Sequence, residues 1–193
     1  MNLEMHKQRD DMKVWLSNDE IETLIGYPDR LEKRIAFALG ARCGLRSHEI
    51  LDVRPSHAVE TESGWFLRVW EGKGDKYRET PLPPDLATRI ETIDEMREGD
   101  DPIVSVTSTR SLRRWVKKAT LGLRKETDDK GWTYVSTHDL RRSWAGQLRS
   151  ADVDAMVVLN WGGWNDLETF LNHYKGEDTP ETQLRERTKV DWL

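Results

Sequence analysis

Hydrophobic residues recur through most of the chain at spacings of three and four, the period of a helix with one buried face. The stretch Ser17-Asn18-Asp19-Glu20 is a capping box, because Ser17 and Glu20 can satisfy backbone N–H groups at the start of a helix that ends near Gly26. The same spacing predicts helices over 29–43, after a cap at Ser47, over 84–98 and 109–125, in short pieces from Thr137 onward, and finally after Thr179-Pro180-Glu181.

One segment alternates in the manner of a strand instead. Residues 65–70 read Trp-Phe-Leu-Arg-Val-Trp, so that one side of an extended chain is apolar throughout. The turn sequence Gly-Lys-Gly-Asp follows at 72–75 and predicts a β-hairpin with Lys73 near its tip. We therefore predict a mainly α fold that carries a small antiparallel β-hairpin sheet, in the α+β class.

Composition is compatible with one folded domain of 193 residues, since 36% of the residues are hydrophobic and nine are tryptophan. No apolar run reaches the length of a membrane span, and the N-terminus lacks the apolar core of a signal peptide. We therefore expect no membrane partner and a cytoplasmic location. Cys43 is the only cysteine, and His6, His48 and His57 lack metal-ligand spacing, so the sequence predicts a buried thiol and no metal site.

The charges are distributed unevenly along the chain. The formal net charge is −5, yet residues 110–149 contain eleven Lys or Arg and four Asp or Glu, a local net charge of +7. Binding of a polyanion depends on the local potential, so this pattern indicates an acidic body with a basic face that could contact DNA. A solvated helix face is the equally weighted alternative. The candidate contacts to the phosphate backbone of DNA are Arg110, Arg113, Arg114, Lys117, Lys118 and Arg142.

Four separated elements stand out together: Arg46 in "CGLRSHEI", Lys73 in "WEGKGDKYRETPLP", His138 with Arg141 in "THDLRR", and Tyr174 in "LNHYKG". Each is ordinary alone, since a lone arginine is usually a surface charge and a tyrosine on a helix usually packs. In this order they resemble the catalytic domain of the tyrosine recombinase family, also called the phage integrase family, which includes the Xer-type resolvases. The resemblance extends from about Trp15 to Lys175 and implies that family's fold.

The resemblance also implies roles for the residues that handle phosphate. Arg46 and Arg141 match two arginines that clamp the nonbridging oxygens, a task suited to planar guanidiniums without a metal ion. Glu49 matches an acidic residue that helps hold the site together. His138 matches the histidine that assists proton movement, and Trp164 falls at a later position filled by His or Trp, where an indole N–H could reach a phosphate oxygen.

Two further roles follow from the same resemblance. Tyr174 matches the nucleophile, whose phenol needs proton acceptance because its ordinary pKa is about 10. Lys73 matches the hairpin lysine that would protonate the leaving 5′ oxygen, and Lys76 is its close rival. We assign His173 to structure or to a DNA contact. Arg142 lies about 100° from Arg141 around a helix. It is expected to contact the phosphate backbone of DNA or to be a solvated charge.

The implied organisation has three parts. Residues 1–14 are expected to form a tail or linker, residues 15–175 the catalytic domain, and residues 176–193 a tail helix that docks either on a neighbouring subunit or on its own domain. The implied organisation leaves no residues for the family's N-terminal core-binding domain, so the chain is expected to be either a catalytic-domain fragment or an unusually short member. Trp164 lies ten residues before Tyr174, and the "GGW…HY" form looks most like archaeal, particularly haloarchaeal, integrases; an acidic surface agrees with adaptation to high salt.

The resemblance implies a site-specific DNA recombinase that cuts and rejoins double-stranded DNA through a 3′-phosphotyrosyl intermediate. It needs no cofactor or ATP, because the phosphotyrosine retains the bond energy, and it would act as a homo-tetramer on DNA. Two alternatives remain open at this point. One is a topoisomerase IB-like enzyme that nicks and reseals with the same residues. The other is a non-catalytic DNA-binding accessory protein that keeps the fold.

Overall fold

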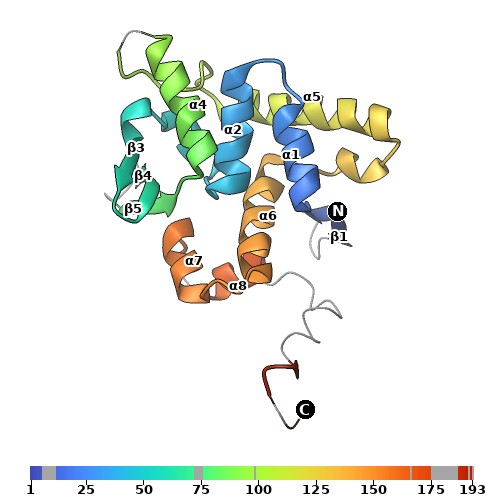
Figure 1. Ribbon diagram of the computed structural model, residues 1–193. Coiled ribbons are helices and arrows are strands. Elements are labelled where there is room, and N and C mark those ends of the chain that lie inside the picture. Colours follow the sequence, from blue (N-terminus) through green and yellow to red (C-terminus); the bar gives the residue numbers. More distant parts are fainter. Residues whose placement is uncertain are drawn as a thin grey trace.

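The helix α2 (Leu31–Arg42) runs through the centre of the protein, and other helices surround it (Figure 1). The computed structural model describes residues 1–5, 12–71, 76–97, 99–165, 167–174, 187–190 and 192. Residues 35–41 of α2 are all buried, which explains why this helix is apolar on several sides. The helices that pack against it include α1 (Asn18–Gly26), α4 (Pro84–Glu95) and α6 (Thr137–Ser150).

The remaining helices follow the predicted spacing closely. They are α3 (Ser47–Asp52), α5 (Thr109–Thr127), α7 (Ala155–Gly162) and α8 (Leu167–Tyr174), with short turns of 3₁₀ helix at η1 (Pro55–His57) and η2 (Lys130–Thr133). The capping box of Ser17 and Glu20 is confirmed. Ser47 was a wrong choice of cap, because the N-cap of α3 is Arg46. The helix predicted after Thr179 begins outside the described residues.

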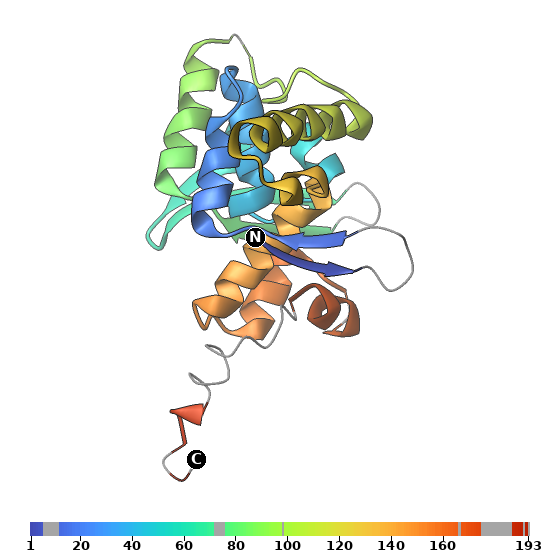
Figure 2. The same ribbon diagram turned by 90° about the vertical axis from the view of Figure 1, so that its right-hand side faces the viewer.

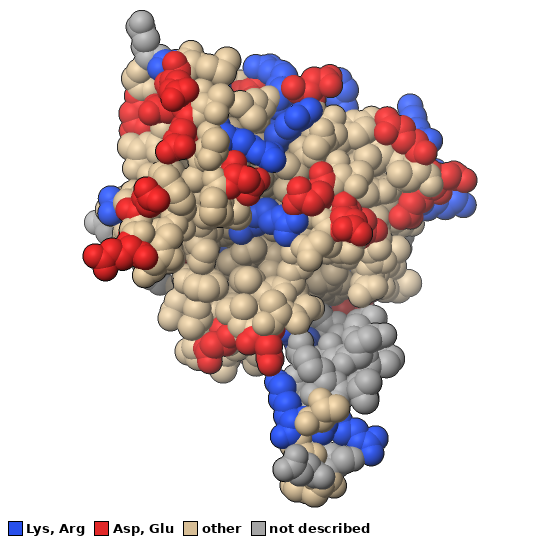
Figure 3. Space-filling model, viewed as in Figure 1, with Lys and Arg blue, Asp and Glu red and all other residues tan. Residues whose placement is uncertain are grey.

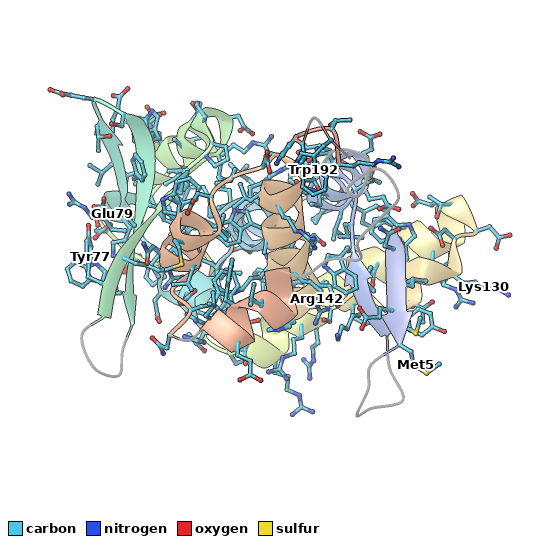
Figure 4. The ribbon with its side chains drawn as sticks, turned by 90° about the horizontal axis from the view of Figure 1, so that it is seen from below. Met5, Tyr77, Glu79, Lys130, Arg142 and Trp192 are labelled. Atoms are coloured by element: carbon cyan, nitrogen blue, oxygen red, sulfur yellow. The ribbon has the colours of Figure 1, made fainter. Side chains whose placement is uncertain are left out.

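The predicted hairpin is confirmed and carries a third strand. The sheet has the order β3 (Ala58–Thr61), β4 (Gly64–Glu71) and β5 (Lys76–Pro81), and both pairs are antiparallel. Leu67 and Val69 of β4 are buried. Tyr77 and Glu79 of β5 point away from the body (Figure 4). Because side chains alternate along a strand, Arg78 between them faces the interior.

A second hairpin forms at the N-terminus, where a tail or linker was expected over residues 1–14. The strands β1 (Asn2–Met5) and β2 (Met12–Trp15) pair antiparallel and lie beside α6 (Figure 2). The Val14 N–H donates to Oδ1 of Asp139 at 3.1 Å, and the Leu16 N–H donates to the Ser143 hydroxyl oxygen at 2.8 Å. For the described residues the tail prediction is therefore corrected: α6 side chains satisfy the outer edge of β2 and hold the hairpin in place.

The apolar interior has two parts. The larger cluster fills the space between α1–α5 and the three-stranded sheet. The smaller one lies between α6, α7 and α8, and consists of Trp144, Ala145, Val158, Trp164 and Phe170. In the part of the chain that the structure describes, no helix has the length and apolarity needed to cross a membrane. The predicted mainly helical fold with small antiparallel sheets is thus confirmed.

The loop between α2 and α3 depends on one glycine. Gly44 has a φ of +68°, in the left-handed region, and a Cβ built on it would lie 2.3 Å from the ring of Trp144. Any larger residue would therefore strain the backbone and displace the indole at the same time. This turn matters because Arg46 follows it by two residues.

We expect Gly44→Ala to lower the free energy of unfolding by about 2–4 kcal/mol, because backbone strain and steric overlap add. Gly26→Ala is the control, since Gly26 has no positive φ and a Cβ there meets nothing within 4 Å. Urea denaturation followed by tryptophan fluorescence measures both variants. A Gly44→Ala protein as stable as Gly26→Ala would contradict this account of the loop.

Candidate active site

Arg46 lies at the junction of the loop and α3, with its guanidinium aimed at the turn after α7. Its Nη2 donates to the carbonyl oxygen of Gly163 at 2.6 Å, and its Nη1 donates to Oε1 of Glu49 at 2.8 Å. The side chain remains 29% exposed. Arg46 is therefore held in one direction while its side chain stays partly exposed.

Arg141 approaches the same place from α6, one turn into the helix. Its Nη1 donates to the carbonyl oxygen of Gly44, and its Nη2 donates to that of Gly162 at 2.6 Å. Only 5% of the residue is exposed. Backbone carbonyls do not change charge, so they fix the guanidinium without neutralising it. Arg46 and Arg141, far apart in the sequence, are thus brought together by two glycine turns.

Trp164 forms the floor beneath Arg141. The Cζ of Arg141 lies 4.0 Å from the centroid of the Trp164 ring, a cation–π contact. The ring stacks on Trp144 at 6.1 Å between centroids and meets the edge of Phe170 at 5.1 Å. Trp164 is 7% exposed and is therefore a packed platform for the arginine. Donation of its indole N–H to a phosphate stays a prediction.

Glu49 connects Arg46 to Arg78, an arginine outside the residues that the sequence predicts for the site. Its side chain is 1% exposed, and its two oxygens accept from Nη1 and Nη2 of Arg78 at 2.8 and 2.7 Å, in addition to the backbone and side chain of Arg46. Burial by itself raises the pKa of Glu49, but the hydrogen bonds and charges of Arg78 and Arg46 outweigh it and lower the pKa to about 2. Glu49 is therefore ionised at neutral pH.

The sequence did contain a signal for Arg78. In "KYRETP" the residue alternates with Tyr77 and Glu79, and it shares its strand face with Thr80, which is fully buried. A charged residue at an inward position of a strand requires a buried partner of opposite charge. That argument would have paired Arg78 with an acidic residue near the site, although it could not have named Glu49.

His138 lies in the first turn of α6, three residues before Arg141 and on a neighbouring part of the helix surface. The side chain is open to solvent, yet the atoms around it remove part of its hydration. This partial burial lowers its pKa below the ordinary 6.5, and the positive charges of Arg142, Arg141 and Arg46 lower it further, while Asp139 opposes them. The neutral imidazole, which can accept a proton, is thus favoured at neutral pH.

The two remaining predicted participants are Lys73 and Tyr174. Lys73 lies outside the described residues, and the side chains of Lys76 and Tyr174 do as well. Tyr174 is the last residue of α8, and α8 packs against α6, the helix that carries His138 and Arg141. The roles of Lys73 as acid and of Tyr174 as nucleophile therefore stay predictions, with Lys76 still a rival for the first.

Arg142 does not match its predicted environment. It is 7% exposed and forms an ion pair with Asp139, and its Cζ lies 5.4 Å from the ring centroid of Trp15. Figure 4 shows it between α6 and the β1–β2 hairpin. The expectation of a solvated charge is wrong, because Asp139 is itself buried and needs a cation. Arg142 holds the N-terminal hairpin against α6.

The basic helix α5 does match its predicted pattern. Leu112, Val116 and Ala119 are buried against the core, and the five candidate DNA contacts Arg110, Arg113, Arg114, Lys117 and Lys118 are exposed. Lys117 also donates to the carbonyl oxygen of Thr133 at 2.7 Å. The face seen in Figure 3, by contrast, carries acidic side chains scattered among basic ones, and an uncharged area over α7. A DNA contact by α5 stays a prediction.

Comparison with known proteins places this chain in a family. The model of the phage integrase family matches residues 14–180. A protein named Tyrosine recombinase XerA from Pyrococcus furiosus is 29% identical over 157 residues, and a tyrosine recombinase from Thermosipho africanus is 31% identical over 166 residues. Each alignment covers 80% of this chain and 54% of the relative, so the chain spans about half the length of these curated proteins.

Solved structures give the same fold. The crystal structure of XerA recombinase aligns with a TM-score of 0.75 and 18% identity, covering 92% of this chain and 65% of that one. XerH site-specific recombinase bound to difH substrate, in a pre-cleavage complex, aligns with a TM-score of 0.67 and 20% identity, covering 91% and 53%. At these identities the structures show the fold, and the family match covers most of the sequence. The chain belongs to the phage integrase family of tyrosine recombinases.

Proposed function

We propose that this chain is a site-specific DNA recombinase or integrase that cuts and rejoins DNA through a 3′-phosphotyrosyl intermediate. One observation carries the proposal: Arg46 and Arg141 converge on the Gly162–Gly163 turn, where Arg46 donates to the carbonyl oxygen of Gly163 and Arg141 to that of Gly162. Such a fixed pair of cations suits the negative charge that builds on the nonbridging oxygens of a phosphodiester under attack. The names of the curated relatives support the same class of reaction.

In the proposed reaction the phenol oxygen of Tyr174 attacks the scissile phosphorus, and the bond from phosphorus to the 5′ oxygen breaks. Arg46, which is partly exposed, contacts the phosphate, and Arg141 adds a fixed positive charge beside it. A 5′-hydroxyl from the partner duplex then attacks the phosphotyrosine and frees Tyr174. Because the arginines neutralise charge and the phosphotyrosine retains the bond energy, this scheme requires neither a cofactor nor ATP.

Proton transfers complete the proposed scheme. His138 accepts the phenolic proton, which its lowered pKa permits because the neutral imidazole is favoured near pH 7. Lys73 donates a proton to the departing 5′ oxygen, with Lys76 as the alternative donor. Trp164 keeps Arg141 in place from below. Every group in this scheme belongs to the positions that carry the family resemblance.

The proposed substrate is double-stranded DNA, and the proposed assembly is a homo-tetramer on it. The exposed basic side chains of α5 support DNA binding through the phosphate backbone. Two structural neighbours are described as bound to DNA: XerH with its difH substrate and the Tn1549 transposon integrase. Exposed apolar side chains on α7 and α8, namely Met156, Val157, Leu167 and Leu171, support self-association. A DNA-processing enzyme of this kind would act in the cytoplasm.

We also propose an archaeal source with adaptation to high salt. The acidic net charge of −5 supports this, and four of the curated relatives come from Pyrococcus and Thermococcus. DNA binding and folding can be measured across salt concentrations. A salt-adapted protein should stay folded and bind DNA at salt concentrations where the phosphate contacts of an ordinary protein weaken.

Covalent trapping tests the nucleophile. Incubation with nicked duplexes from a randomised pool should give a protein–DNA adduct with the intact chain and none with Tyr174→Phe, because only the phenol oxygen can form the ester. Tyr134→Phe is the control, since Tyr134 is an exposed tyrosine outside the site. The adduct is detected by denaturing gel and mass spectrometry. Survival of the adduct in Tyr174→Phe would refute the proposal, and products that only lose supercoils would indicate a topoisomerase.

The protonation of His138 predicts that the cleavage rate falls in acid, which gives an acidic limb in the pH–rate profile. Below its lowered pKa the imidazolium cannot accept a proton, so cleavage should slow as pH falls through that value, and His138→Gln should lose about 10²- to 10⁴-fold in rate together with the limb. NMR titration of the assigned imidazole measures the pKa directly, and His57→Gln should leave the limb unchanged. A His138 pKa at or above 6.5, or an unaltered limb in His138→Gln, would contradict this role.

Glu49 predicts a change of stability in acid. Its pKa is about 2 when folded against an ordinary 4.5, so its stabilising contribution is present above pH 4.5 and is lost as pH falls from 4.5 toward 2. Glu49→Gln should lower the free energy of unfolding by about 3–5 kcal/mol at pH 7, because it leaves the side chain of Arg78, which is 8% exposed, without a carboxylate, and by less at pH 3. The exposed Glu79→Gln serves as control. Equal losses at both pH values in denaturant titrations would refute the assignment.

A further inference from the structure

Arg78 is a buried arginine outside the set that the family resemblance assigned. Its Nε donates to the carbonyl oxygen of Trp161 at 2.9 Å, and its Nη1 and Nη2 donate to the two oxygens of Glu49. The side chain is 8% exposed. A Cβ on Gly163 would lie 2.8 Å from its Cδ, so the arginine also lies against the turn that holds Arg46. One side chain therefore joins β5, α3 and α7.

The net charge around Glu49 depends on Arg78. A buried carboxylate paired with Arg46 alone would cancel the positive charge that a phosphate needs to meet. With Arg78 present, two guanidiniums share one carboxylate, and the group keeps a net positive charge. The fork of Arg78 occupies both oxygens of Glu49, and the remaining contacts of these oxygens go to Arg46. Arg78 thereby balances the negative charge of Glu49, so that Glu49 does not cancel the positive charge of Arg46.

The position of Arg78 in the chain adds a mechanical link. It follows the predicted acid Lys73 by five residues in the sequence, and its partner Trp161 precedes Trp164 in the segment that leads to α8. Val69 is its cross-strand neighbour and is buried, so the inward face of the sheet fixes the direction of the side chain. The guanidinium of Arg78 therefore fixes the position of β5 relative to Glu49, which binds Arg46, and to the end of α7.

We propose that Arg78 is a positioning residue for DNA cleavage, which neutralises Glu49 and aligns Arg46 with the scissile phosphate. The inference rests on the proposed function. It differs from a purely structural ion pair in one respect: when Arg78 is removed, Glu49 becomes harmful to catalysis, because its charge then opposes that of Arg46. Removing the charge of Glu49 as well should therefore restore part of the rate.

The experiment compares Arg78→Met, Arg78→Lys and the double variant Arg78→Met with Glu49→Gln in the covalent trapping assay, using nicked duplexes that the wild-type chain cleaves. Arg68→Gln is the matched control, since Arg68 lies on the same sheet but is 45% exposed and paired with Glu79. Each protein is first checked for folding by thermal unfolding. The rates are also measured on a duplex with a methylphosphonate at the scissile position, which removes the charge that Arg46 contacts.

We expect Arg78→Met to slow adduct formation by about 10- to 100-fold, the usual cost of losing a residue that orients a catalytic group. Arg78→Lys should be intermediate, because it keeps the charge but loses the fork. The double variant should be faster than Arg78→Met, the deficit of Arg78→Met should shrink on the methylphosphonate, and Arg68→Gln should match the wild type.

Two results would overturn the inference while the wild type still forms an adduct. One is a folded Arg78→Met protein with the wild-type rate. The other is a double variant slower than Arg78→Met, together with an equal deficit on both linkages, which would make Arg78 a structural ion pair only. If the wild-type chain forms no adduct, the proposed function itself fails and the inference fails with it. The two failures are therefore distinguishable.

Discussion

The buried carboxylate of Glu49 is the constraint on which the site depends. A carboxylate that is 1% exposed stays ionised only if hydrogen bonds and charges replace its lost hydration, and Arg46 and Arg78 supply them. The same contacts that stabilise Glu49 also fix both guanidiniums. Because Glu49, Arg46 and Arg78 come from α3, its N-cap and β5, this one charge joins the central helices to the sheet.

Neutral groups near Glu49 orient the guanidiniums of Arg46 and Arg141 without cancelling their positive charge. Carbonyl oxygens of Gly44, Gly162 and Gly163 accept from Arg141 and Arg46, and the Trp164 ring supports Arg141. Glycine is needed at both turns for a physical reason. Gly44 and Gly163 have positive φ, and a Cβ on Gly162 would lie 1.7 Å from the Trp164 ring. The loops are thus shaped for close approach, and their carbonyl oxygens hold the guanidiniums of Arg46 and Arg141 in place.

Much of the local structure was predictable because it depends on neighbours in the sequence. The capping box at Ser17, the alternation in β4 and the apolar stripe of α5 all act over a few residues, and all three are confirmed. The errors arose where partners are distant. The sequence predicts a tail at residues 1–14, and the hairpin forms instead because Asp139 and Ser143 of α6, far away in the sequence, satisfy its backbone. The sequence predicts Arg142 as a DNA contact or a solvated charge, and it is buried instead because it pairs with Asp139 beneath that hairpin.

By itself, the sequence determined most of the helices, the β4–β5 hairpin, the family and the order of the residues that carry the proposed chemistry. Only the tertiary structure decided which of those residues meet, how far each is buried and which additional group joins them. Arg78 shows the difference, since its inward position follows from strand alternation but its pairing with Glu49 follows from packing of β5 against α3. The reason is physical: secondary structure depends on short-range periodicity, whereas burial and the pairing of charges depend on contacts between segments far apart in the chain.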